Sequence, residues 1–377
     1  MIESPERRGT DSVKWGLYEK DVLPLWVADM DFVSPPAVIA ALQQRVDHGV
    51  FGYAMESKEL KELILARMEK LYQWKIKLED IVLLPGVVAA FNLVCQAVTS
   101  PGESILIQPP VYPPFFQAPR YAGARTVVNE VRVKDDGKYG IDFEDFESAL
   151  EKDTRCFLLC NPHNPIGRVY TRQELHAMAE ICLRHNMVIC SDEIHSDLVY
   201  PGASHVPIAS IDAEIANQTV TLIAPSKTYN IAGLECSALI CTNAELREKI
   251  QHARRGLLGG VNALGMIAGA AAYREGDDWL REVMAVLESN RDFLMGYLAE
   301  KLPAIKMIQP EATYLAWLDC RELNLPVSPA KYFLEHARVA VNAGEDFGKP
   351  GEGFVRLNFG CTRSTLLEAL ERMRRVI

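Results

Sequence analysis

Three apolar runs of β-strand character most constrain the fold of this chain, because a polar cluster directly follows each of them. The runs span residues 156–159, 187–189 and 219–223, and the polar clusters contain Asn164, Asp192 and Lys227 in that order. Strands and helices alternate to about residue 242, which predicts a mainly parallel sheet covered by helices. Ligands bind at the carboxyl ends of the strands in such sheets. The sequence therefore predicts an α/β fold with a site where the three clusters meet.

The length of 377 residues is sufficient for a large core and two domains. Thr171 and Glu174 form a capping box, which predicts a helix from there to about residue 185. Further helices are expected at 37–48, 57–74, 86–98 and 277–302 and at the C-terminus, and strands at 104–108, 314–319, 339–342 and 354–359. We predict an N-terminal arm (1–45) that joins a small α+β domain (279–377), and a large domain (46–278). The helix at 277–302 is the expected hinge.

Composition narrows the possible environments and partners. The net charge of −10 argues against general nucleic-acid binding. The nine cysteines contain no Cys-x-x-Cys pair and several lie in apolar runs, which predicts reduced, buried thiols in a cytoplasmic protein. No apolar run approaches the length of a membrane span, and the N-terminal residues lack the apolar stretch of a signal peptide. We therefore expect neither a nucleic-acid nor a membrane partner.

Each polar residue at the strand ends has a structural and a chemical interpretation. Lys227 could be a solvated surface charge, or a Schiff-base amine whose pKa is lowered by partial desolvation. Asp192 could cap a helix or serve as a loop carboxylate, and Asn164 could belong to an Asn-Pro turn. The three together favour chemistry, because asparagine, aspartate and lysine each stand at a strand end.

This trio resembles the fold-type I pyridoxal-phosphate (PLP) enzymes of the aminotransferase class I/II group, and the resemblance covers nearly the whole chain. It implies the PLP-dependent transferase fold, with a mainly parallel seven-stranded sheet and a smaller α+β domain. It implies that Lys227 is catalytic and holds PLP, and that Asp192 stays ionised beside the pyridinium nitrogen. Asn164 would donate a hydrogen bond to the phenolic oxygen of the cofactor and contact substrate.

The cofactor phosphate is expected at the start of the helix at 86–98. Backbone amides of Gly86, Val87 and Val88 can cradle an anion there, and Ser226 adds a hydroxyl. Gly86 could also be a plain turn glycine. Many aminotransferases carry an arginine eight residues after the Schiff-base lysine, whereas this chain has Glu235 at that position. This departure puts a generic transaminase in doubt.

Five further segments resemble the MalY/PatB-type cystathionine β-lyases, also called C–S lyases. They are residues 25–32, 51–53, 110–115, 192–195 and 230–234. The resemblance implies that Tyr112 stacks over the cofactor ring and contacts substrate. It also implies that Tyr53 reaches the cofactor phosphate of a neighbouring subunit, so that a homodimer shares its sites. Without it, Tyr112 would be a core aromatic, Tyr53 a rim residue and Trp26 simple packing.

His195 is expected to shape the hydrogen bonding around the cofactor ring or to be a satisfied structural histidine. A metal site with His163 or His205 lacks the usual ligand spacing. Arg356, in an apolar strand, matches the family's arginine for the substrate carboxylate, which a guanidinium binds bidentately. Arg363 is the second candidate, or a surface residue at the start of the last helix.

The resemblance implies α,β-elimination from a cysteine S-conjugate or cystathionine, which gives pyruvate, ammonia and a thiol, homocysteine in the case of cystathionine. Lys227 would remove the α-proton and protonate the leaving sulfur. An aminotransferase would use the same lysine, aspartate and asparagine, and stays the main alternative. An additional regulatory role, through binding of another protein, is a third possibility.

Overall fold

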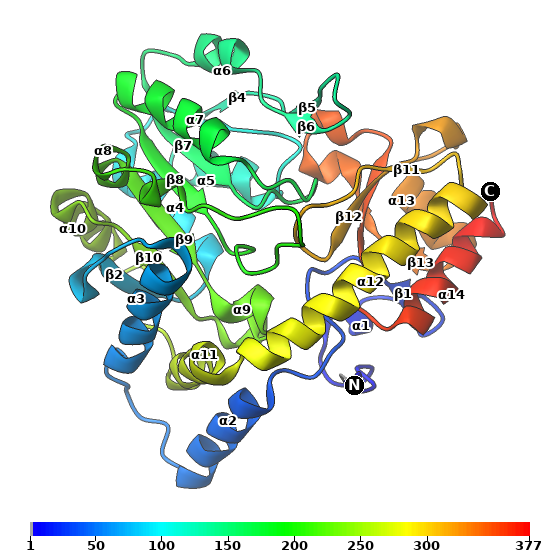
Figure 1. Ribbon diagram of the computed structural model, residues 1–377, viewed down its shortest axis with the longest axis horizontal. Helices are drawn as coiled ribbons and strands as arrows, with labels where there is room; N and C mark the ends of the chain where they lie inside the picture. The colour runs from blue at the N-terminus through cyan, green and yellow to red at the C-terminus, as the bar shows by residue number, and fades with distance from the viewer. Residues whose placement is uncertain (1–2) are drawn as a thin grey trace.

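A seven-stranded sheet forms the centre of the computed structural model, which describes residues 3–377 (Figure 1). Its strands, in spatial order, are β2 (Ile81–Leu84), β10 (Ser237–Ile240), β9 (Thr219–Ile223), β8 (Val188–Asp192), β7 (Thr154–Cys160), β3 (Ser104–Ile107) and β4 (Arg125–Val128). The last five run parallel, and β10 is antiparallel to both of its neighbours. The predicted mainly parallel α/β sheet is confirmed.

Helices cover both faces of this sheet because successive strand residues point to opposite sides. Ile105 and Leu158 face a core shared with α4 (Val87–Val98), α5 (Pro114–Tyr121) and α10 (Ala244–Arg254). Leu106 and Leu159 face a core shared with α6 (Phe143–Ala149), α7 (Arg172–Arg184) and α8 (Ala213–Asn217). Near β2 and β10, α3 (Lys58–Tyr72) and α11 (Ala263–Glu275) complete the covering layers.

Helix ends follow the local signals in the sequence. The capping box before α7 forms, with the Glu174 amide donating to Thr171 Oγ1 at 3.2 Å and the Thr171 amide to Glu174 Oε2 at 2.7 Å. Helix α2 (Pro36–His48) ends at Gly49, whose φ of 76° lies in the left-handed region that glycine adopts without strain.

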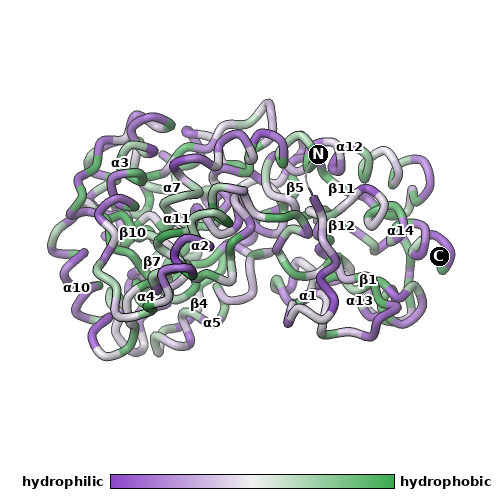
Figure 2. The backbone as a smooth tube through the Cα atoms, turned by 90° about the horizontal axis from the view of Figure 1, so that it is seen from below, coloured by the Kyte–Doolittle hydropathy of each residue, from purple (hydrophilic) through white to green (hydrophobic). Residues whose placement is uncertain are grey.

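A second, four-stranded sheet lies toward the C-terminus. Its order is β11 (Lys306–Met307), β12 (Leu315–Asp319), β15 (Phe354–Asn358) and β14 (Asn342–Ala343). Helices α12 (Asp277–Lys301), α13 (Pro329–Tyr332) and α14 (Arg363–Arg374) share its core. The N-terminal segment joins this core, because β1 (Leu23–Pro24) pairs with β13 (Val339–Ala340) and Leu25 is buried there. Figure 1 places β1 beside β13 and α14, and Figure 2 shows β1, α13 and α14 at the same end of the molecule as the C-terminus.

One predicted strand was wrong in its extent. Residues 339–342 form two short strands rather than one, because β13 pairs with β1 while β14 pairs with β15 in the other sheet. Val341 is the point at which the chain passes from one pairing to the other. The division into an arm (1–45), a large domain (46–278) and a small domain (279–377) stays a prediction.

Two further expectations concern the chain as a whole. All nine cysteines are buried and unpaired, as predicted. In residues 3–377, we find no helix with both the length and the apolar character that crossing a membrane requires.

Candidate active site

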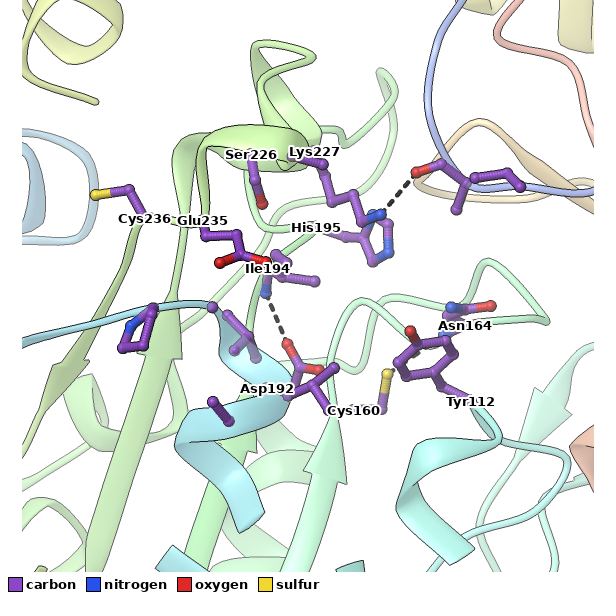
Figure 3. A pocket seen from close by; sticks show the side chains of 18 of the residues that line it. Tyr112, Cys160, Asn164, Asp192, Ile194, His195, Ser226, Lys227, Glu235 and Cys236 are labelled. Carbon is purple, nitrogen blue, oxygen red and sulfur yellow. Dashed lines mark hydrogen bonds between the residues drawn. The ribbon is translucent and has the colours of Figure 1, made fainter. Parts of the chain in front are cut away.

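A cavity of about 470 Å³ opens at the carboxyl ends of β7, β8 and β9 (Figure 3). This volume is in the range of small-molecule sites. The cavity brings together most of the residues that the sequence singled out: Gly86, Val87, Val88, Tyr112, Asn164, Asp192, His195, Ser226, Lys227 and Arg356. They come from both sheets, since Arg356 lies on β15 and the strand-end residues follow the central sheet.

Lys227 lies in the short helix α9 (Pro225–Thr228), which directly follows β9. Its Nζ donates a hydrogen bond to the carbonyl oxygen of Ala28, at 2.7 Å, from the N-terminal segment. Burial, together with the positive charge of Arg356, lowers the pKa of the Lys227 ammonium to about 8. Near neutral pH a useful fraction of this side chain is therefore the free amine.

Asp192 is the last residue of β8, and its side chain is buried in the cavity wall. Its carboxylate accepts a hydrogen bond from the Ile194 amide at 3.1 Å. Burial raises the pKa of Asp192 to about 7, and no lysine or arginine of the described chain forms an ion pair with it. A cationic group bound beside Asp192 would restore its ionised form.

Arg356 is only 4% exposed, yet none of the ion pairs among residues 3–377 includes it. Its guanidinium donates to Asn164 Oδ1 at 3.0 Å, to Asn342 Oδ1 at 2.6 Å and to the Trp26 carbonyl oxygen at 3.0 Å. The Nε–H has no protein acceptor, and burial lowers the pKa of Arg356 to about 10. A buried cation held only by neutral groups is a binding site for an anion.

The opposite end of the cavity is formed by the first turn of α4. Gly86 precedes this helix with a φ of 95°, a backbone conformation that residues with a side chain rarely adopt. The cavity-lining residues Val87 and Val88 stand at the helix start, where backbone amides lack intrahelical acceptors. Figure 3 shows Ser226 and Glu235 at the cavity, next to Lys227 and Ile194.

Tyr112 and His195 are two of the ring side chains that line the cavity. Tyr112 precedes α5, and burial raises the pKa of its hydroxyl. His195 is buried, has an unpartnered Nδ1, and packs edge-on against Tyr314. Burial lowers the pKa of His195 to about 3, so its imidazole is neutral at physiological pH. His163 and His205 are engaged elsewhere, with Tyr170 and Glu193, and no metal-type cluster occurs within the described residues.

Two predicted residues lie outside the cavity. Tyr53, in the segment between α2 and α3, is fully exposed. Arg363, at the start of α14, donates from Nε to Asn290 Oδ1 at 2.9 Å and from Nη2 to Ser289 Oγ at 2.8 Å. Its guanidinium also stacks on Phe293 at 4.2 Å. Arg363 therefore links α14 to α12, and the structural interpretation of this residue is the one we retain.

A family model described as aminotransferase class I and II matches residues 20–373.

The chain belongs to the aminotransferase class I and II family.

Within this family, the chain is similar to cystathionine beta-lyase PatB of Bacillus subtilis (strain 168), with 42% identity over 98% of this chain and 97% of that protein. It is also similar to the structure of cystalysin from Treponema denticola, which contains pyridoxal 5′-phosphate. That match has a TM-score of 0.95 and 34% identity, and covers 100% of this chain and 98% of the other. The PLP-bound C–S lyase from Staphylococcus hominis matches with a TM-score of 0.93, 31% identity and the same coverage.

Sequence reasoning missed two groups at this aminotransferase-family cavity. Asn342 stands opposite Arg356 in the β14–β15 pair and holds its guanidinium. A polar residue ending the apolar run at 339–341 was an available signal for it. The other is the Ala28 carbonyl oxygen, which accepts a hydrogen bond from Lys227 Nζ and, as a backbone group, leaves no signal in a sequence.

Proposed function

We propose that this chain is a PLP-dependent C–S β-lyase, which cleaves cystathionine and related cysteine S-conjugates to pyruvate, ammonia and a thiol. The observation that carries the proposal is the pairing, in one cavity, of the Lys227 amine with the uncompensated cation of Arg356. The Lys227 amine can move a proton, and the Arg356 guanidinium can bind an α-carboxylate. Similarity to PatB over nearly the whole chain supports the choice of reaction.

The residues of the cavity fit pyridoxal phosphate. Asp192 is a buried carboxylate without a protein cation, and would hold the ring nitrogen. The free amides at the start of α4 and the Ser226 hydroxyl would hold the phosphate. Lys227 would hold the aldehyde carbon, Tyr112 would stack on the ring and Asn164 would face the phenolic oxygen. Among residues 3–377, Lys227 is the one lysine or arginine at the phosphate end, which also carries Glu235.

When bound, the cofactor supplies an electron sink for the negative charge that develops at the substrate α-carbon. The chain supplies the rest. Arg356 fixes the substrate carboxylate, with Asn342 and Trp26 holding the guanidinium in place. Lys227 Nζ takes the α-proton and delivers a proton to the departing sulfur. The neutral His195 ring contributes no competing charge.

An assay of products distinguishes this lyase from an aminotransferase. We expect cystathionine to give pyruvate, ammonia and homocysteine in equal amounts, without any added keto acid. The physical reason is that elimination ends with a leaving sulfur, whereas transamination needs an acceptor for the amino group. Coupled lactate dehydrogenase, ammonia and thiol assays measure the three products. Amino transfer to 2-oxoglutarate that outpaces pyruvate release from every cysteine conjugate would favour the aminotransferase.

We further propose a homodimer in which Tyr53 serves the partner's cofactor site. Large apolar side chains are exposed together in and beside the segment between α2 and α3: Val46, Val50, Phe51, Tyr53 and Met55. Such a group on a soluble protein is typical of an interface. The buried, unpaired cysteines support a cytoplasmic location for the dimer.

Tyr53→Phe tests the shared site. The change removes one hydrogen-bonding hydroxyl, so we expect the dissociation constant for PLP to rise by about fivefold while the dimer persists. Titration of cofactor fluorescence and sedimentation velocity measure the two properties. Tyr121→Phe, at an exposed tyrosine of α5 outside the cavity, is the matched control. A fully active monomer at assay concentration would contradict the shared site.

A further inference from the structure

The carbonyl oxygen of Ala28 accepts two hydrogen bonds, one from a residue that follows the seven-stranded sheet and one from a residue that precedes β12 of the four-stranded sheet. Lys227 Nζ donates to it at 2.7 Å, drawn as a dashed line in Figure 3, and the Tyr314 hydroxyl donates at 2.9 Å. A carbonyl oxygen has two lone pairs. Tyr314 therefore occupies one of them and leaves a single direction of approach for the lysine amine.

The position of Tyr314 is fixed by an unusual backbone conformation. Thr313, just before it, has a φ of 71°, which is strongly disfavoured for a β-branched residue. Two hydrogen bonds hold this conformation, from the Thr313 amide to the Leu198 carbonyl at 2.7 Å and from the Tyr200 hydroxyl to the Thr313 carbonyl at 2.6 Å. Such strained residues persist only where their surroundings hold them, and they cluster at functional sites.

The peptide that carries the Ala28 carbonyl is held independently of Tyr314. Asn358 Nδ2 donates to the carbonyls on either side, those of Val27 at 2.5 Å and Asp29 at 2.6 Å. Loss of the Tyr314 hydroxyl would therefore leave the peptide in place. The hydroxyl is not needed to fold this segment, and its effect falls on the other donor, Lys227.

We propose that Tyr314 is a positioning residue that restricts the uncombined Lys227 amine to one side of the Ala28 carbonyl, facing the cavity. From there the amine reaches the substrate α-carbon and sulfur in a single orientation. This inference rests on the proposed function in so far as Lys227 moves protons during the reaction.

The hydroxyl also affects how readily Lys227 is protonated. Its hydrogen points at the carbonyl oxygen, and so places partial positive charge near the ammonium. The other charged or titratable groups that act on Lys227 are Arg356, Asp29, Asp192 and His195, and none of them is hydrogen-bonded to the Tyr314 hydroxyl. Without Tyr314 Oη, the Ala28 carbonyl oxygen accepts a hydrogen bond from Lys227 alone. The ammonium form of Lys227 is then favoured.

Tyr314→Phe tests the proposal, because it removes the hydroxyl and keeps the ring. We expect kcat for pyruvate release to fall by about fivefold with KM within about twofold of the parent. In the full-length chain freed of cofactor, the pH at which half of Lys227 reacts with acetic anhydride should rise by about half a unit. Peptide mass spectrometry measures that labelling. The control is Tyr332→Phe, which removes a hydroxyl–carbonyl bond to Val376, outside the cavity.

The two readouts separate this inference from the function it rests on. If the parent protein releases no pyruvate, the proposed function fails, and the labelling shift alone then decides the role of Tyr314. If Tyr314→Phe matches the parent in kcat and labelling, or if Tyr332→Phe changes both equally, Tyr314 is structural and the inference is overturned. A rise in the pH of half-labelling of Lys227 that occurs in Tyr314→Phe and not in Tyr332→Phe supports the positioning role of Tyr314.

Discussion

We expect Lys227→Ala to remove almost all pyruvate release, with a fall in kcat of about a thousandfold or more. In the proposed mechanism one amine performs both proton transfers and also holds the cofactor, so no second group would replace it. The side chain lies in the cavity, its pKa is near 8, and its only hydrogen bond among the described residues goes to the Ala28 carbonyl. A coupled lactate dehydrogenase assay measures the loss.

Two controls make this result specific. Borohydride reduction followed by peptide mass spectrometry should place the pyridoxyl adduct on Lys227 in the parent and on no residue in the variant. Lys331→Ala, at an exposed helix residue outside the cavity, should keep full activity. Added methylamine should restore part of the activity of Lys227→Ala, since a small free amine can carry the missing proton. An adduct on another lysine would contradict the assignment of Lys227 as the residue that holds the cofactor.

The central sheet and its strand-end residues could be predicted because their signals are local. A buried parallel strand is a short apolar run, and Asn164, Asp192 and Lys227 each stand within a few residues of such a run. Adjacent parallel strands then bring their carboxyl ends to one edge. The capping box at Thr171 and the stop at Gly49 are local for the same reason.

Features set by distant pairing could not be predicted in this way. The run at 339–342 divides between two sheets because its partners, β1 and β15, come from opposite ends of the chain. Arg363 is held by Asn290 and Ser289, more than seventy residues earlier, so its sequence neighbours do not reveal its contacts. The Ala28 carbonyl accepts hydrogen bonds from residues about 200 and 286 positions away in the sequence. Local patterns contain none of this information.

Arg356→Ala should raise KM for cysteine S-conjugates by about 10- to 150-fold, because a charge-assisted bond to the substrate carboxylate contributes about 1.5–3 kcal/mol. The loss should be selective for the carboxylate. As competitive ligands of the parent protein, cystine should bind much more tightly than cystamine, its decarboxylated analogue. In Arg356→Ala this preference for cystine should disappear. Arg356→Lys keeps the charge without the planar fork, so we expect it to recover only part of the affinity.

The choice of control follows from the two arginines of this region. Arg363→Ala breaks bonds to Ser289 and Asn290 outside the cavity, and should change thermal stability more than KM. Arg356 also contacts Asn164, so bound cofactor must be quantified by absorbance in each variant before KM is compared. Equal KM values for Arg356→Ala and Arg363→Ala, at equal cofactor content, would contradict the carboxylate site. A large difference would instead tie substrate recognition to the one buried guanidinium that has no carboxylate partner within residues 3–377.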